Sequence, residues 1–406
     1  MNKKKESKVV PNVRFKGFTD DWKQRKLNDI ADKVTEKNAG LQYIETFTNS
    51  AEFGIISQRD FFDHDIAKMS SLGGYYIVRN EDFVYNPRIS TSAPVGPINR
   101  NKLGRTGVMS PLYTVFRPHD VDITYLEYFF KSKYWNSFMN FNGDSGARSD
   151  RFSIKDSVFF EMPIPLPYIE EQRKIGEHLT QLDRLITLHQ QKITLLTKLK
   201  KAMLEKMFPK KGSVIPEIRF NGFANAWEQR KLGELAFFNP KEKLPDVFEY
   251  VDLESVVGIE MLSHRTEEKA TAPSRAQRLA HTGDLFYQTV RPYQKNNYLF
   301  EKSEKHYVFS TGYAQLRPLV DGYFLLSLVQ NGQFVKTVLD NCTGTNYPAI
   351  NANDLAEIDV FYPKDEHEQH QIGEYFRHLD HLITLHQRKI DKIKNMKKAM
   401  LDQMFI

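Results

Sequence analysis

Residues 175–208 read IGEHLTQLDRLITLHQQKITLLTKLKKAMLEKMF, and residues 372–405 read IGEYFRHLDHLITLHQRKIDKIKNMKKAMLDQMF. The two stretches align without a gap and are identical at 20 of 34 positions. A second repeat relates residues 11–27 (PNVRFKGFTDDWKQRKL) to residues 216–232 (PEIRFNGFANAWEQRKL). The segments between the repeats match only in scattered places, so the sequence predicts two different globular units held in one repeated frame.

Each stretch of the longer repeat is predicted to be a long helix, because its apolar residues recur in steps of four and three. In the first helix the apolar positions are Ile175, Leu179, Leu182, Ile186, Ile193, Leu196, Met203 and Met207. In the second they are Ile372, Phe376, Leu379, Ile383, Ile390, Ile393, Met400 and Met404. His189 and Lys200 fill the gaps in the first stripe, and His386 and Lys397 fill those in the second.

A helix of this length with one narrow apolar stripe needs a partner, so the two helices are expected to pair with each other. The two histidines are interpreted as seam residues that specify the pairing register. Whether the helices lie antiparallel depends on where the globular unit between them returns the chain.

The segments between the helices predict mixed α/β units, so the predicted fold class is α+β. Stretches typical of strands are 75–78, 83–85 and 112–116 in the first unit, with 285–287 and 313–316 in the second. Each unit then carries one amphipathic helix, around 123–140 or 322–340, and a polar glycine loop, at 143–149 or 343–347. The predicted boundaries are a disordered basic tail at 1–10, a globular unit at 11–167, a helix at 168–212, a second unit at 213–363 and a helix at 364–406.

The composition sets broad limits on function. A net charge of +6 and a pI near 9.0 permit a polyanionic partner without requiring one. The single cysteine, Cys342, excludes an internal disulfide framework and a multi-cysteine zinc site. No apolar run reaches the roughly 18 residues that cross a bilayer, and the lysine-rich start lacks the apolar stretch of a signal peptide. We therefore expect a cytoplasmic protein with no membrane partner.

Catalytic motifs are weak in this sequence. The Asn-Pro-Pro-aromatic loop of adenine methyltransferases is approached only at 86–88 (NPR) and 239–241 (NPK). Asp246, Glu267 and Lys269 have the order of a metal-dependent nuclease core, but the spacing is loose and the Glu-Lys part is expected in a polar stretch rather than a strand. Chance is the favoured explanation of this triplet.

Histidines in the second long helix give a weak metal signal. His367 with His370, and His378 with His381, have the helical spacing that can hold a metal. The first helix has residues typical of a solvated face at the same places, namely Glu170, Arg173, Gln181 and Arg184. No metal site is predicted.

Polar loops carry the remaining functional signal, and as sets they favour contact with DNA. Arg and Lys suit guanine edges and phosphates, and Asn and Gln suit adenine. The candidates in the first unit are Arg88, Arg100, Lys102, Arg105, Arg148 and Arg151. Those in the second unit are Gln288, Arg291, Tyr293, Lys295, Asn296, Asn297 and Asn346. For any single residue a solvated surface is the stronger explanation.

The repeated motifs resemble the specificity subunit of type I restriction–modification enzymes. The pattern is P-x-[VI]-R-F-x-G-F-x3-W-x-Q-R-K-L, then a Pro-rich turn, E-Q-x-x-I and a long helix ending K-K-A-M-L-x-x-M-F, and it occurs twice. It is carried by Arg14, Phe15, Gly17, Phe18, Trp22, Gln172, Ile175 and Gly176, and again by Arg219, Phe220, Gly222, Phe223, Trp227, Gln369, Ile372 and Gly373. The second turn is a weaker match, with FYP (361–363) against MPIPLP (162–167).

The resemblance implies two target recognition domains, each of which reads one half of a bipartite asymmetric site in double-stranded DNA. It implies two long antiparallel helices that form an intramolecular coiled coil with a pseudo-two-fold repeat, set the spacer and dock two adenine-N6 methyltransferase subunits. Two motor/nuclease subunits complete the assembly, and S-adenosylmethionine, ATP and magnesium belong to those partners. The chain itself is expected to be non-catalytic, with no cofactor and no metal.

Two alternatives remain open from the residues. One is a stand-alone two-domain DNA-binding regulator, although the sequence has no recognisable helix-turn-helix. The other is a nuclease built on Asp246, Glu267 and Lys269.

Overall fold

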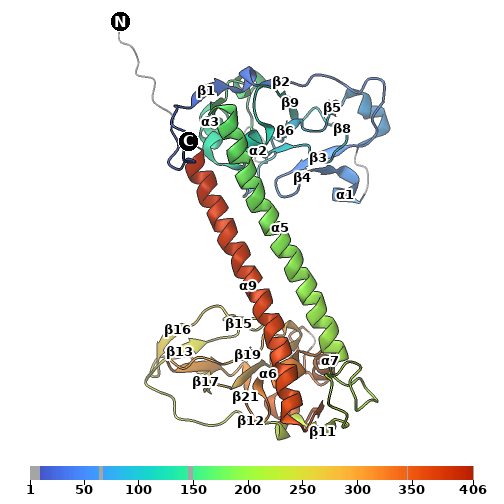
Figure 1. Cartoon of the computed structure of the whole chain (residues 1–406), viewed down its shortest axis with the longest axis vertical. Helices are drawn as coiled ribbons and strands as arrows, with labels where there is room; N and C mark the ends of the chain where they lie inside the picture. The colour runs from blue at the N-terminus through green and yellow to red at the C-terminus, as the bar shows by residue number, and fades with distance from the viewer. Residues whose placement is uncertain (1–9, 64–66, 145–149, 345, 406) are drawn as a thin grey trace. The chain divides into compact units, whose positions relative to one another are not determined.

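The computed structural model describes residues 10–63, 67–144, 150–344 and 346–405. The chain divides into two compact units: unit 1 is Met1–Leu188 with Lys389–Ile406, and unit 2 is His189–Arg388. Helix α5 (Ile169–Lys206) and helix α9 (Glu366–Met404) each contribute a segment to both units (Figure 1). Nine of the ten residues of the expected basic tail lie outside the described residues.

Unit 1 contains two groups of strands and a short frame ladder. In the frame ladder, β1 (Lys23–Lys26) pairs antiparallel with β10 (Pro163–Leu166). The first sheet has the order β2 (Ala31–Lys33), β9 (Thr114–Pro118), β6 (Phe83–Tyr85) and β7 (Ile98–Arg100). The second group consists of the hairpin β3 (Phe47–Ser50) and β4 (Gly54–Ser57) beside the pair β5 (Tyr76–Val78) and β8 (Gly107–Met109), linked by a parallel bridge from Thr46 to Val108.

Unit 2 repeats this topology. Its frame ladder pairs β11 (Glu228–Lys231) with β22 (Asp359–Tyr362). Its first sheet has the order β12 (Ala236–Phe238), β21 (Tyr313–Pro318), β18 (Leu285–Gln288) and β19 (Tyr298–Leu299). Its second sheet has the order β16 (Arg265–Glu268), β13 (Val247–Val251), β20 (Tyr307–Ser310) and β17 (Ala276–Leu279), and the hairpin β14 (Val256–Val257) and β15 (Glu260–Met261) is additional. The two globular parts therefore share one strand order although their sequences differ.

The amphipathic helix expected in each unit is two helices, which corrects that prediction. Unit 1 has α2 (Ile123–Lys131) and α3 (Tyr134–Asn142), and unit 2 has α6 (Gly322–Gln330) and α7 (Gly332–Asp340). Polar residues at the breaks explain the difference. The Ser132 hydroxyl donates to the Phe129 carbonyl, and the Asn331 side chain accepts from the Gln333 and Phe334 amides that begin α7.

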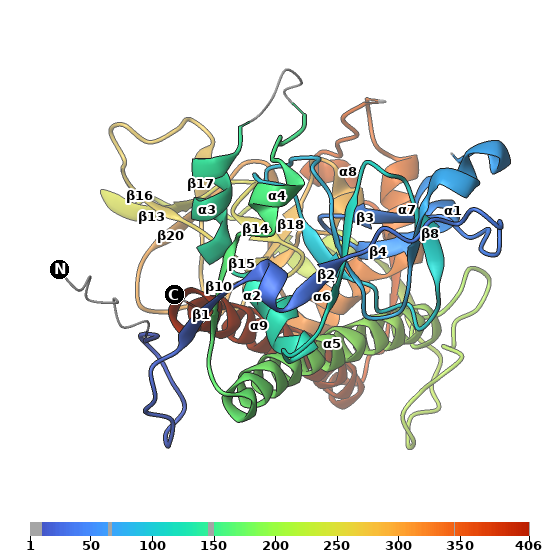
Figure 2. The ribbon, with the colours of Figure 1, turned by 90° about the horizontal axis from the view of Figure 1, so that it is seen from above.

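Short helical segments complete the two units. The α-helical ones are α1 (Gln58–Phe62), α4 (Asp156–Phe159) and α8 (Ala352–Ala356). The 3-10 turns are η1 (Leu27–Asp29), η2 (Met69–Gly74), η3 (Leu232–Glu234) and η4 (Pro292–Gln294). Figure 2 shows α1, α4 and α8 from above. No helix among the residues described is both long and apolar enough to cross a membrane.

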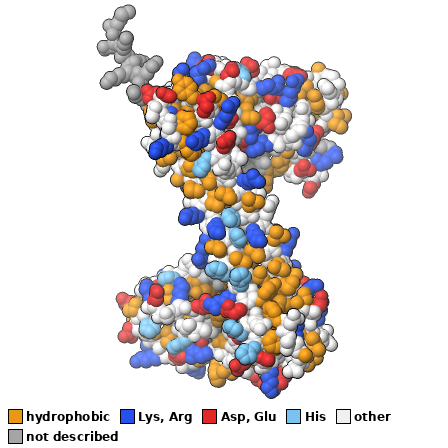
Figure 3. All heavy atoms as spheres, viewed as in Figure 1, with side chains coloured by type: hydrophobic (Ala, Val, Ile, Leu, Met, Phe, Trp, Pro, Cys, Tyr) orange, Lys and Arg blue, Asp and Glu red, His pale blue; other side chains and the backbone are white. Residues whose placement is uncertain are grey.

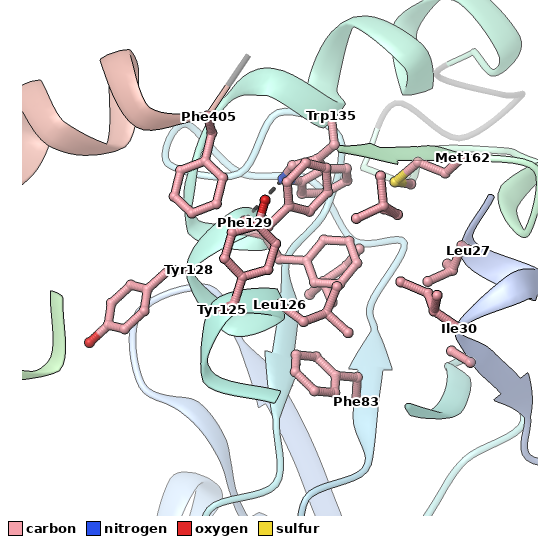
Figure 4. Packing of buried hydrophobic residues seen from close by; sticks show 14 of the residues in the cluster. Leu27, Ile30, Phe83, Tyr125, Leu126, Tyr128, Phe129, Trp135, Met162 and Phe405 are labelled. Atoms are coloured by element: carbon pink, nitrogen blue, oxygen red, sulfur yellow. Dashed lines mark hydrogen bonds between the residues drawn. The ribbon is translucent and has the colours of Figure 1, made fainter. Parts of the chain in front are cut away.

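The core of unit 1 joins its first sheet, α2 and the end of α9. Tyr125 and Phe129 are completely buried, and the ring of Phe405 lies 5.3 Å from that of Tyr125 and 6.0 Å from that of Phe129 (Figure 4). Phe83 belongs to the same cluster. In unit 2 the residues at and just after the end of α5 take the equivalent place, because Phe208 packs on Trp227 and Phe324. Each globular part is thus anchored on the last turn of one long helix.

Within unit 2 the two long-helix segments run antiparallel. His189 of α5 meets His386 of α9 with the Nδ1 atoms 2.9 Å apart, and Lys200, further along α5, pairs with the earlier Asp380 of α9 at 2.5 Å. The predicted stripe residues that are buried are Ile175, Leu179, Leu182, Leu196, Met207, Ile372, Phe376, Leu379, Ile390 and Met404. Those that are half-buried are Ile186, His189, Ile193, Lys200, Met203, Ile383, His386, Ile393, Lys397 and Met400.

Candidate DNA interface

The repeated frame residues fix the start of each long helix on its own unit. Arg14 makes a two-pronged ion pair with the buried Glu171, with both hydrogen bonds at 2.7 Å. Arg219 pairs with the buried Glu368 in the same way at 2.6 and 2.7 Å. A paired arginine on a carboxylate without solvent access is a strong geometric constraint. The sequence showed these residues only as repeats, and their pairing comes from the fold.

A second repeated ion pair holds the first sheet of each unit. Asp82 accepts from Arg117 at 2.8 and 2.9 Å, and Asp284 accepts from Arg317 at 2.8 and 3.0 Å. The hydrogen bond to the carboxylate raises the pKa of Arg117 and of Arg317, against the opposing effect of burial. In each unit the aspartate directly precedes β6 or β18 and the arginine lies in the neighbouring strand, β9 or β21, so the pairs stiffen the strands from which the polar loops emerge.

The polar loop after β6 or β18 returns to the sheet by one shared hydrogen-bond ladder. In unit 1 the Ile89 amide donates to the Asp150 carbonyl at 3.1 Å, and the Phe152 amide donates to the Pro87 carbonyl at 2.7 Å. In unit 2 the Arg291 amide donates to the Pro348 carbonyl at 2.7 Å, and the Ile350 amide donates to the Thr289 carbonyl at 3.0 Å. The position of Ile89 in unit 1 is therefore taken by Arg291 in unit 2.

Three of the candidates in unit 1 are engaged within the protein. Arg100 is only 9% exposed and pairs with Glu127 at 2.6 Å and Glu81 at 3.0 Å, which corrects its assignment to a DNA-facing loop. Arg105 pairs with Glu45 at 2.7 Å, and this hydrogen bond holds the pKa of Glu45 below its usual value. Lys102 remains largely exposed but its Nζ lies 3.3 Å from Glu127.

Arg88 and Arg151 are brought together in unit 1. They form an isolated antiparallel bridge between the loop after β6 and the segment before Phe152. The Arg88 side chain is 66% exposed, with its guanidinium 3.9 Å from Asp150. Arg151 is half-buried. Arg148 lies outside the described residues.

Four candidates in unit 2 build the loop rather than face outward. Gln288 and Asn297 are almost fully buried, and Oδ1 of the Asn297 side chain accepts from the Gln288 backbone amide at 2.9 Å, which corrects their assignment. Asn296 accepts from the Gly258 amide at 2.8 Å. Lys295 donates to the Gln330 carbonyl at 2.8 Å, and burial together with the nearby Lys200 and Lys201 lowers the pKa of its amine.

The remaining candidates of unit 2 form an open polar surface. Tyr293 and Asn346 are exposed, and the Arg291 guanidinium lies 4.4 Å from the ring centroid of Tyr347. Tyr347, which was not among the predicted site residues, is 64% exposed and lies in the same TGTNY loop as Asn346. Figure 3 shows that basic and acidic side chains are interspersed on the visible face.

The metal and nuclease hypotheses receive no geometric support. Within the described ranges, no group of three or more His, Cys, Asp or Glu residues is placed to hold a metal ion. Glu267 lies in a strand, β16, contrary to the expectation that this polar stretch is not a strand, but its carboxylate pairs with Arg265 at 2.7 Å. The histidines of α9 are dispersed: His370 lies 3.2 Å from Asp321, and His378 and His381 line an open groove of about 430 Å³.

Each unit carries polar loops at the ends of strands stiffened by ion pairs, and this arrangement occurs twice in the chain. The family model described as "Type I restriction modification DNA specificity domain" matches residues 19–198 and 266–395. The chain belongs to this family, and it is a specificity subunit of the type I class, a DNA-recognition component. The resemblance inferred from the repeated motifs is thereby confirmed.

Named relatives carry the same description, and solved structures share the fold. The specificity subunit of the type I restriction enzyme MjaVIII from Methanocaldococcus jannaschii is 25% identical over 74% of each chain. The putative MjaX specificity subunit of the same organism is 23% identical over 94% of this chain and 92% of its own. The S subunit crystal structure from M. genitalium has a TM-score of 0.62 at 14% identity and covers 98% and 99% of the two chains. A chain from a structure of type I R-M complex assembly has a TM-score of 0.54 at 15% identity, covering 94% and 96%.

Proposed function

We propose that each globular part reads one half of a bipartite asymmetric site in double-stranded DNA. The observation that carries this proposal is the shared loop ladder with unlike side chains: Ile89 occupies the position in unit 1 that Arg291 occupies in unit 2. Base edges in the major groove are distinguished by particular side chains, so unlike loops on like scaffolds read unlike half-sites. In this proposal α5 and α9 form a continuous antiparallel coiled coil with pseudo-two-fold symmetry. The length of this coiled coil sets the DNA spacer between the two half-sites.

The long helices also supply the proposed docking faces for two identical methyltransferase subunits. The sequence LITLHQ stands in both helices, at 185–190 and 382–387. Leu188 is 51% exposed in unit 1, and its counterpart Leu385 is 37% exposed in unit 2. Exposed apolar side chains repeated in two units of one topology fit two copies of one partner related by a two-fold axis. Two motor/nuclease subunits would complete the assembly, and the partners would supply S-adenosylmethionine, ATP and magnesium.

Exchanging one globular part for that of a relative tests the modular reading. Replacing residues 28–165 should change one half of the methylated motif and leave the other half and the spacer unchanged, because the loop ladder of unit 2 is untouched. Single-molecule methylation mapping of cells that express the chimera with its methyltransferase gives the motif directly. A change in both half-sites would contradict separate reading by the two parts.

An insertion in the first long helix tests the spacer role. About four extra residues near Leu195 add one helical turn, so the spacer of the methylated motif should lengthen while both half-sites persist.

The regulator alternative is tested by the isolated chain, which should bind the motif strongly without any methyltransferase if it acts alone.

A further inference from the structure

We propose that Arg291 reads a guanine in the half-site of unit 2, with Tyr347 as the platform that orients its guanidinium. This inference rests on the proposed function, since it assumes that the loop after β18 enters a DNA groove. It goes further by naming one side chain, one base and one supporting residue.

The backbone of Arg291 is held in an unusual conformation by the loop. Its φ is +55°, a left-handed geometry that residues with a Cβ rarely adopt without support. The Arg291 amide donates to the Pro348 carbonyl at 2.7 Å, and its carbonyl accepts from the Gln294 amide at 3.0 Å. Strained backbone of this kind is concentrated at functional positions.

The residues around Arg291 explain how the loop supports that conformation. Lys295 also has a positive φ, of 57°, and is fixed by two hydrogen bonds with Gln330: its Nζ donates to the Gln330 carbonyl at 2.8 Å, and its own carbonyl accepts from Gln330 Nε2 at 3.1 Å. The buried side chain of Asn297 accepts a hydrogen bond from the Gln288 backbone amide. The buried amides and the lysine are therefore the supports of the loop, and Arg291 is the side chain they present.

The Arg291 side chain is oriented but not neutralised. Its Cζ lies 4.4 Å from the centroid of the Tyr347 ring, which places the guanidinium over the aromatic face. In the part of the chain that the structure describes, no carboxylate forms an ion pair with it. Because the N–H donors of a guanidinium lie in its plane, stacking uses the face and leaves the edge available for hydrogen bonds.

A fixed, unpaired guanidinium edge matches the O6 and N7 acceptors of guanine in the major groove, where bidentate arginine contacts are the commonest specific ones. Other arginines of the two units are used differently. Arg100, Arg105 and Arg317 pair with carboxylates, and Arg88 has Asp150 at 3.9 Å. Unit 1 places Ile89 at the equivalent ladder position, so this contact belongs to one half-site only.

Methylation mapping of the full complex carrying Arg291→Ala tests the inference. The native motif should contain a G·C pair in the half-site of unit 2, and the variant should accept other bases there with discrimination reduced roughly 10- to 100-fold. The other half-site and the spacer should be unchanged. Tyr347→Phe keeps the ring and should preserve the motif, whereas Tyr347→Ala should relax the same position. Arg230→Ala removes an exposed arginine of unit 2 that pairs with Glu228 at 3.2 Å, and it serves as the control for charge.

Two outcomes would overturn the inference. An equal loss of methylation at every site with the motif intact would make Arg291 a phosphate contact, and an unchanged motif at full activity would remove it from recognition. Copurification of the variant with its methyltransferase at native yield establishes that it is folded. Exchange of residues 233–362 separates the two levels: if the exchange changes the half-site and Arg291→Ala does not, only this inference fails. If neither changes it, the proposed function fails as well.

Discussion

The two globular parts of this chain have the same strand order and differ in their connections. Between β3 and β4 unit 1 has a tight turn at 51–53, whereas between β13 and β16 unit 2 has the excursion 252–264 with its own hairpin. The frame contacts, by contrast, are matched residue for residue, as Arg14–Glu171 and Arg219–Glu368 show. Buried ion pairs keep the scaffold constant, whereas the surface connections between strands are free to diverge.

Removing the frame arginines should produce the largest effect and test whether the two scaffolds are equivalent. Arg14→Ala and Arg219→Ala each leave a buried carboxylate without its ion-pair partner. Removing one partner of a buried pair lowers the free energy of unfolding by about 3–5 kcal/mol. Glu368 keeps a hydrogen bond from the Trp227 indole at 3.2 Å, whereas in the described part of the chain Glu171 has no such indole donor. Denaturant unfolding should therefore show a greater loss of unfolding free energy for Arg14→Ala than for Arg219→Ala.

Arg25→Ala is the matched control for these frame variants. Arg25 in β1 is exposed and pairs with Asp29, four residues later, at 3.4 Å, so its removal should change the free energy of unfolding by less than about 0.5 kcal/mol. Equal losses for Arg14→Ala, Arg219→Ala and Arg25→Ala would contradict the frame role of the buried pairs.

The lysines that interrupt the apolar stripes should show a smaller and unequal effect. Lys200 pairs with Asp380, whose side chain is 8% exposed, and Lys397 pairs with Asp183, whose side chain is 38% exposed. In both cases a tyrosine hydroxyl, from Tyr323 or Tyr128, donates to the other carboxylate oxygen. Lys200→Met should lower the free energy of unfolding by about 2 kcal/mol, because it leaves the buried Asp380 carboxylate unpaired. Lys397→Met should lower it by less than about 1 kcal/mol, because Asp183 is more exposed. Thermal unfolding of the two variants at neutral pH measures the difference, and a reversed order would show that exposure does not govern it.

These ion pairs also show which contacts could be predicted from the sequence and which could not. The heptad spacing predicted that His189 and His386 share a seam with Lys200 and Lys397, because periodicity is local information. It could not indicate that Arg100 is buried, since its partner Glu127 lies on α2 and is adjacent only after folding. An arginine in a polar segment looks the same in sequence whether it faces solvent or a carboxylate. For the same reason the sequence predicts a surface position for Asn297, although its side chain is a buried support of the loop after β18.

Each long helix has a glycine at the same repeat position, and the two glycines differ in how closely the neighbouring helix packs against them. A Cβ on Gly373 would lie 3.0 Å from the Phe324 amide nitrogen and closer still to Asp321 Oδ1, the cap of α6. A Cβ on Gly176 would lie 3.1 Å from the Thr124 methyl group. Alanine gains about 1 kcal/mol of helix propensity at either site. Gly176→Ala should be close to neutral, and Gly373→Ala should cost roughly 1–2 kcal/mol net by overpacking. Equal melting temperatures for the two variants would show that α6 adjusts to the added methyl group without a loss of stability.

Acid should loosen the second sheet of unit 2 before its counterpart in unit 1. Hydrogen bonds from Lys305 and then His264 lower the pKa of Glu249 in β13, while β3 of unit 1 carries no titratable side chain. A carboxyl group whose pKa is lower in the folded state adds stability above its unfolded pKa, roughly 4.3, and that stability is lost as the pH falls through the folded value. Hydrogen exchange of residues 247–251 should therefore accelerate below about pH 4 relative to residues 47–50, and Glu249→Gln should reduce this dependence. If both strands respond to acid alike in the native chain, Glu249 does not supply the difference between the two sheets.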